Sequence, residues 1–289
     1  MSNRKKILVG SSVYKLAANP EVDRQYRDTA EKAYEQFITF LHFKSTEELL
    51  QERLVYPWKQ AEGVLFWGVD FHKVNSDYPN LRVYIGPDNG KGAKGIHVWL
   101  TEKQTSQINI KTLPIEKLRT HHPWGQSLMG PWQQFEAVRD HIPHDIFIHE
   151  FIHYLDTMRR KKPYKLKMVD VGEEKAKQKY RQKTMTPDTR HTEYLSSPKE
   201  FNAWYQASIQ SLEKFLDDVV ELFPENLDAH LGTEQKFIDT ALKMFNQERP
   251  THKGHPMWKV NLLDEKYRRK LLKRLHGFYD YYVKKIQNE

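Results

Sequence analysis

The sequence predicts an α+β protein in which a small β-sheet is preceded and followed by helical segments. Three observations support this fold class: helical periodicity in the first fifty residues, short β-type runs between residues 63 and 110, and helical periodicity from about residue 127 onward. Of the 289 residues, 38% are hydrophobic and 29% are charged, which is typical of a folded globular protein. No run approaches the roughly 18 apolar residues that a membrane span needs.

Two helices are expected before the sheet. The first covers residues 20–43, where apolar and aromatic side chains recur every three or four residues and so share one helical face. A second, short helix is expected to begin at Ser45. Ser45-Thr46-Glu47-Glu48 has the capping-box pattern, in which the serine and the second glutamate each accept a backbone N–H of the other residue.

The middle of the chain is rich in β-branched and aromatic residues. These predict four strands, at residues 63–69, 81–85, 96–100 and 108–110. The glycine-rich stretch 86–92 is interpreted as a hairpin connection between two of them. It lacks the Gly-Lys-Ser/Thr ending of a phosphate-binding loop, and glycine is common at turn positions.

The remainder of the chain is predicted to be mostly helical. Its helices are expected at residues 144–159, 198–223, 226–245 and 262–285. Ser197 is the expected N-cap of the second of these helices, because Pro198 follows it at the first helical position. The patterns divide the chain into an N-terminal helical segment, a core and a C-terminal helical segment, at residues 1–60, 61–223 and 224–289.

The composition limits the chemistry and suggests a compartment. The chain has no cysteine, which excludes disulfides, a thiolate nucleophile and a cysteine-ligated zinc site. Any transition metal must therefore be bound by histidines and carboxylates.

The N-terminal sequence is basic, but its apolar stretch is too short and interrupted for a signal peptide, so we expect a cytoplasmic protein that does not enter a membrane.

The formal net charge of +8 is concentrated between Arg159 and Lys183. This basic segment holds 11 of the 46 basic and 3 of the 38 acidic residues, which leaves 35 of each in the rest of the chain. Such a charge run is typical of a solvated surface, and the functional alternative is that it selects acidic substrates or an anionic partner. No aromatic interleaving accompanies it, so nucleic acid is not the expected partner.

The motif that carries chemistry is His149-Glu150-Phe151-Ile152-His153. Residues i and i+4 share one face of a helix, so the two imidazoles can bind one tetrahedral zinc ion. Glu150 lies beside that position, where a carboxylate can take a proton from a zinc-bound water. The surrounding residues are uncharged, as expected of a helix packed in a core. The alternative is a buried helix with two hydrogen-bonded histidines and no metal.

This motif resembles the signature of the zincin metallopeptidases. His-Glu-Phe-x-His-x-x-Asp followed by Glu-Phe-x-Ala at Glu200 resembles the gluzincins, in particular the catalytic domains of anthrax lethal factor and the Pro-Pro endopeptidases, and also metallopeptidase sequences of tailed phages. The resemblance covers residues 144–206. It implies a zincin-like fold and a zinc-dependent endopeptidase, a hydrolase that attacks a protein or peptide substrate with a metal-activated water and Glu150 as general base.

A catalytic zinc usually takes a third ligand from the protein. Glu200 is the expected third ligand and Glu193 is the alternative. Ala203 and Ala207 favour Glu200 as the ligand. Their small side chains would let the helix of Glu200 pack closely on the helix that carries the histidine motif. The competing interpretation of Glu200 is a capping box with Ser197, which would use its carboxylate for backbone hydrogen bonding alone.

Two more residues are assigned roles near the zinc. Asp156 lies about 10 Å along the helix from His149, too far to share the ion, and is expected to hydrogen-bond a ligand histidine. In the toxin-like relatives, a tyrosine usually seven residues before the third ligand assists the oxyanion. The resemblance therefore makes Tyr194 a candidate catalytic residue, although it precedes Glu200 by six residues.

Zincins usually present an edge strand just before the metal helix, and an extended substrate joins it by backbone hydrogen bonds. Residues 96–100 are the candidate for this strand. We expect Ile96, Val98 and Leu100 to face the core, with His97 and Trp99 on the opposite face.

Two further hypotheses do not require peptidase activity. The first is a binding protein that has a zincin fold but no peptidase activity, either a phage protein or a protein that interacts with a host. It would engage an anionic partner such as nucleic acid through the basic segment, and salt-sensitive binding would support it. The second is a metal-free helical scaffold in which the histidine motif is accidental, and a melting temperature unaffected by chelator would support it.

Overall fold

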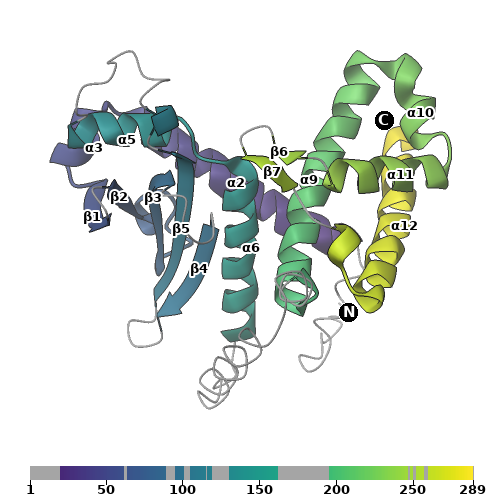
Figure 1. Ribbon diagram of the computed structural model, residues 1–289, viewed down its shortest axis with the longest axis horizontal. Coiled ribbons are helices and arrows are strands. Elements are labelled where there is room, and N and C mark those ends of the chain that lie inside the picture. The colour runs from purple at the N-terminus through teal and green to yellow at the C-terminus, as the bar shows by residue number, and fades with distance from the viewer. Residues whose placement is uncertain are drawn as a thin grey trace, which may run out of the picture. The chain divides into compact units, whose positions relative to one another are not determined.

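The computed structural model describes residues 20–61, 64–88, 95–100, 105–114, 116–118, 130–161, 195–246, 248–249, 252–256 and 260–288. They form the predicted α+β structure, with a five-stranded sheet and helices before and after it in the chain (Figure 1). The chain divides into two compact units, one formed by Asp28–Leu166 and the other by Met1–Arg27 with Lys167–Glu289.

The unit Asp28–Leu166 contains the five-stranded sheet. Its strands are β1 (Tyr56–Ala61), β2 (Val64–Asp70), β3 (Leu81–Asp88), β4 (Gly95–Leu100) and β5 (Thr105–Pro114). Their spatial order is β1-β2-β3-β5-β4, in which β3 and β5 are parallel and the other neighbours antiparallel. Because β5 lies between β3 and β4, the prediction that residues 86–92 join neighbouring strands as a hairpin is wrong.

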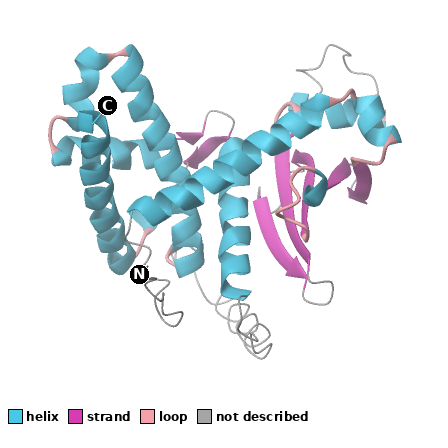
Figure 2. Ribbon diagram, turned by 180° about the vertical axis from the view of Figure 1, so that it is seen from behind, coloured by secondary structure: helices cyan, strands magenta, loops and turns pink. Residues whose placement is uncertain are grey.

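The helices of this unit are the greater part of α2 (Pro20–Phe43), α3 (Thr46–Gln51), α5 (Pro131–Arg139) and α6 (His144–Lys161), with the 3₁₀ helix η1 (Phe71–Lys73). In the views from both sides, α6 lies next to β4, the last strand of the sheet (Figures 1 and 2), and contacts the face of β4 that carries Gly95 and His97. The predicted capping box of α3 is confirmed. Ser45 Oγ accepts the Glu48 N–H at 3.3 Å, and the Glu48 carboxylate accepts the Ser45 N–H at 2.9 Å.

Aromatic packing holds α6 in place within this unit. The Phe147 ring stacks on Phe37 of α2 and on Phe151, with ring centroids 5.4 and 5.7 Å apart. Phe71 of η1 joins the same cluster, 5.7 Å from Phe37. All four rings are fully buried, so burial of their apolar surface stabilises the position of α6.

The other unit is mainly helical in the residues described. It contains α9 (Pro198–Leu222), α10 (Leu227–Leu231), α11 (Glu234–Phe245) and α12 (Glu265–Asn288), with η2 (Pro224–Asn226), η3 (Val260–Leu262), β6 (Glu248–Arg249) and β7 (His252–Pro256). The single helix expected over residues 226–245 is interrupted at Gly232. Thr233 then acts as the N-cap of α11, accepting the Lys236 N–H at 3.2 Å.

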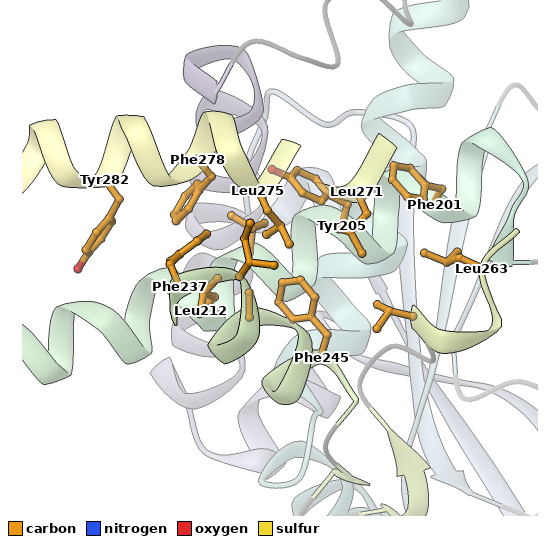
Figure 3. Close-up of a cluster of buried hydrophobic side chains, with 14 of the residues drawn as sticks. Phe201, Tyr205, Leu212, Phe237, Phe245, Leu263, Leu271, Leu275, Phe278 and Tyr282 are labelled. Atoms are coloured by element: carbon orange, nitrogen blue, oxygen red, sulfur yellow. The ribbon is translucent and has the colours of Figure 1, made fainter. Parts of the chain in front are cut away.

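A continuous core fills the space between α9, α11 and α12 (Figure 3). Tyr205, Phe237 and Phe278 are among its buried aromatic side chains. Phe237 of α11 stacks on Phe278 of α12 with ring centroids 6.0 Å apart. This packing accounts for the helical periodicity of the C-terminal sequence, since each helix buries one apolar face.

A buried polar network lies in the same unit. The Arg27 guanidinium donates to Glu213 at 3.0 Å and to Gln206 at 3.3 Å, and Gln206 donates to Asp23 at 2.7 Å. Burial raises the pKa of Asp23, and the nearby Arg274 guanidinium acts in the opposite direction.

Within the described residues, no helix is both long and apolar enough to cross a bilayer.

Candidate metal centre

The His149-Glu150-Phe151-Ile152-His153 motif lies within α6, on the predicted helix. His149 and His153 are each 3% exposed and Glu150 is 5% exposed. Side chains of these types are rarely buried so far without hydrogen-bond partners or a bound ion. Phe151 and Ile152, which lie between the two histidines, are fully buried. Their packing fixes the rotation of α6 about its axis, and this rotation determines where the three polar side chains point.

The two histidine side chains converge. Their Nε2 atoms are 3.1 Å apart, and the rings are nearly perpendicular, at 85°. Two nitrogens that bind one tetrahedral zinc ion at about 2.0–2.1 Å lie about 3.3 Å from each other. His149 and His153 thus present their nitrogens close to the separation that zinc requires. A single N–H···N hydrogen bond between the rings has a similar length and is the metal-free arrangement.

Glu200 is carried by the first turn of α9. Ser197 is the N-cap, as predicted, and its Oγ accepts the Glu200 N–H at 3.3 Å. Glu200 forms a group with His149 and His153 in which one ligand atom from each residue lies within 4.8 Å of the others. Among the described residues, this is the one group of three or more histidine and acidic side chains with such spacing, and it could hold a metal ion.

The structure describes only some of the other residues to which the sequence assigned a role. Asp156 is 7% exposed, and the two alanines of α9 expected to allow close packing, Ala203 and Ala207, are 0% and 2% exposed. Glu193 and Tyr194 lie outside the described residues. Residues 162–183 of the basic segment also lie outside them.

Strand β4 runs along α6 at the site. A Cβ placed on Gly95, the first residue of β4, would lie 2.6 Å from Glu150 Oε1 and 2.6 Å from Ile146 Cγ2. Gly95 therefore approaches the motif glutamate more closely than any residue with a side chain could. Gly95 was not predicted as a site residue, because its contact with Glu150 leaves no local pattern in the sequence.

The expected orientation of β4 is wrong. His97 pairs with Ile108 of β5, which is fully buried, and residues paired across antiparallel strands point to the same face. The His97 ring lies against Tyr154 of α6, with ring centroids 6.3 Å apart, whereas Ile96 is 44% exposed. The register with β5 decides the orientation, because a shift of one residue would exchange the two faces.

Tyr154, the residue that follows His153 on α6, is uncharged at neutral pH. Burial raises the pKa of Tyr154 to about 12, and Tyr78 adds to the same effect. The Tyr78 ring packs edge-on against Tyr154 and Phe151, with centroids 5.9 and 5.3 Å away.

Searches against protein-family models, curated proteins and solved structures found no match to this chain. Function is therefore inferred from the side chains themselves. Two converging imidazoles, a carboxylate grouped with them and a second carboxylate next to one imidazole form a set that can bind a divalent metal and also accept a proton.

Proposed function

We propose that this protein is a zinc-dependent metallopeptidase of gluzincin type, in which His149, His153 and Glu200 bind zinc and Glu150 is the general base. One observation carries the proposal: on α6, two buried histidines place their Nε2 atoms 3.1 Å apart, and a buried glutamate follows the first of them. Two imidazoles and one carboxylate, with a fourth position open, form a donor set used by catalytic zinc sites.

The residues divide the chemistry between binding and proton transfer. When bound, zinc supplies a Lewis acid that polarises the scissile carbonyl and lowers the pKa of a coordinated water toward ~7. Glu150 accepts the proton of the attacking water and later delivers it to the leaving amine. His149 and His153 must be neutral to bind the metal, since a protonated imidazole has no free lone pair.

The proposed substrate is an extended peptide. In the described part of the chain, β4 is the last strand of its sheet and has β5 on one side only. The backbone groups of its other side can therefore pair with an added strand, which is a common way of binding extended peptides. Gly95 at the start of β4 lies against Glu150, so a peptide bound there would pass close to the proposed base.

A cleavage assay with three proteins tests this function. Wild type loaded with zinc is incubated with a mixed peptide library, and new termini are identified by mass spectrometry. Glu150→Gln keeps the size of the side chain but removes the proton acceptor, so it should bind zinc and cleave nothing. Glu35→Gln, at an exposed position of α2, is the matched control and should cleave as wild type does. A zinc-loaded Glu150→Gln protein with full activity would contradict the mechanism.

A further inference from the structure

We propose that Gly95 is a positioning residue, which fixes the carboxylate of Glu150 by allowing the backbone of β4 to pass directly against it. The catalytic consequence of this inference rests on the proposed peptidase function, whereas the contact itself can be tested on protein without activity.

The space at Gly95 is too small for any side chain. A Cβ at this position would be 2.6 Å from Glu150 Oε1 and 2.8 Å from Glu150 Cγ, and real Cβ atoms essentially never come within 3.0 Å of such atoms. Ile146 Cγ2 is the third neighbour, at 2.6 Å. Two of the three obstructing atoms thus belong to the proposed base.

The backbone conformation does not explain the glycine. Gly95 is not in the left-handed region of φ, so the chain conformation alone would admit a residue with a side chain. The close approach to α6 is therefore the reason why this position requires glycine.

Neither the strand nor the helix can easily move to make room. Strand β4 pairs with β5 along its whole length, from Gly95 opposite Ile110 to Leu100 opposite Thr105. Helix α6 is held by its fully buried Phe147 and Phe151 rings, which pack on Phe37 of α2 and on Phe71 of η1. The Glu150 carboxylate is the end of a flexible side chain, so it is the group that a larger residue at position 95 would displace.

The displacement is large enough to affect catalysis. Restoring an ordinary contact of about 3.4 Å from 2.6 Å requires a movement approaching 1 Å. A misplacement of about 1 Å at a catalytic group can reduce the rate about 100-fold. Zinc binding should persist, because the ligand histidines are not among the obstructing atoms.

Gly95→Ala and Gly86→Ala form a matched pair for the kinetic test. A Cβ at Gly86 in β3 would lie 2.6 Å from the Phe66 ring, so it introduces similar crowding without touching Glu150. We expect both variants to melt at lower temperature and to retain zinc. Gly95→Ala should lose about 100-fold in kcat with KM changed less than about threefold, and Gly86→Ala should keep kcat within about threefold. Unchanged kcat in folded Gly95→Ala would overturn the proposal.

A second test uses melting temperatures of metal-free protein and needs no activity. Glu150→Ala removes both obstructing glutamate atoms, so Gly95→Ala should lower Tm by less than half as much in this background as in wild type. Ile146→Ala is the comparison background and should relieve less of the loss. If Gly95→Ala alone does not fold, the double variant with Glu150→Ala should.

The outcomes separate this inference from the proposed function. An equal loss of Tm in the wild-type and Glu150→Ala backgrounds would overturn the positioning role, and so would relief by Ile146→Ala alone. If zinc-loaded wild type cleaves no peptide, the proposed function fails, while the melting temperatures still decide whether Gly95 constrains Glu150.

Discussion

The Nε2 atoms of His149 and His153 face each other at 3.1 Å on α6, and both rings are buried. This arrangement has two physical interpretations, a shared hydrogen bond or a shared metal ion. They differ in what a chelator does to the protein, because only a bound ion contributes binding free energy to the folded state.

We predict that a chelator lowers the melting temperature and that added zinc restores it. Free zinc at about 1,000 times its Kd would stabilise the folded state by about 4 kcal/mol. Thermal melts of wild type with EDTA and with zinc measure this effect. The His149→Ala/His153→Ala protein is the control and should melt at one temperature in both conditions. A wild-type melting temperature indifferent to chelator would favour the metal-free scaffold instead.

Glu200 and Ser197 allow the ligand and the helix cap to be distinguished. Ser197→Ala removes the hydroxyl that accepts the Glu200 N–H, which should cost about 1 kcal/mol of stability and leave zinc affinity nearly unchanged. Glu200→Ala should weaken zinc binding by more than the roughly 10–100-fold typical of losing an outer hydrogen-bond partner. Competition titration with a fluorescent zinc chelator measures both. Equal zinc affinities in the two variants would exclude Glu200 as a ligand.

Lys270 of α12 should make stability depend on pH. Burial, with help from Arg274, lowers the pKa of Lys270 to about 8 from its ordinary 10.5. Between these values the unfolded chain holds a proton that the folded chain has lost, so folding becomes more favourable as the pH rises from about 8 to 10.5. In urea unfolding, the free energy of unfolding of wild type relative to that of Lys270→Met should be larger at pH 9.5 than at pH 7. The same difference at both pH values would contradict this.

The Arg27 side chain should contribute strongly to the stability of its unit. It is 1% exposed and donates to Glu213 at 3.0 Å, so Arg27→Ala leaves a largely buried carboxylate without this partner. Removing one partner of a buried pair typically costs about 3–5 kcal/mol. Lys44→Ala is the control, because its partner Glu52 is half exposed, and should change stability by no more than about 1 kcal/mol. Equal losses of unfolding free energy in Arg27→Ala and Lys44→Ala, measured by denaturant titration, would contradict the stabilising role of Arg27.

Features that depend on neighbouring residues in the chain were predictable from the sequence. The helix over 20–43, the capping box at Ser45 and the N-cap at Ser197 all follow from local spacing and local hydrogen bonds. The histidine motif belongs to the same class, since the helix itself sets the separation of its two rings. Periodicity and capping residues suffice for such features because nothing distant has to be known.

Features that depend on strand pairing were not predictable. Strand β1 contains Pro57 and polar residues and lacks the alternation of a half-buried strand, so only its pairing with β2 reveals it. The orientation of His97 depends on its register with β5. The contact of Gly95 with Glu150 joins residues 55 positions apart, and no local pattern in the sequence encodes it.

The zinc content per chain tests the central claim most directly. Purified wild type, reconstituted with zinc and freed of unbound metal, is measured by elemental analysis beside His149→Ala/His153→Ala. The metal centre predicts one zinc per chain in wild type and none in the double variant. Absence of zinc in folded, reconstituted wild type would contradict the metal centre, and with it the proposed peptidase.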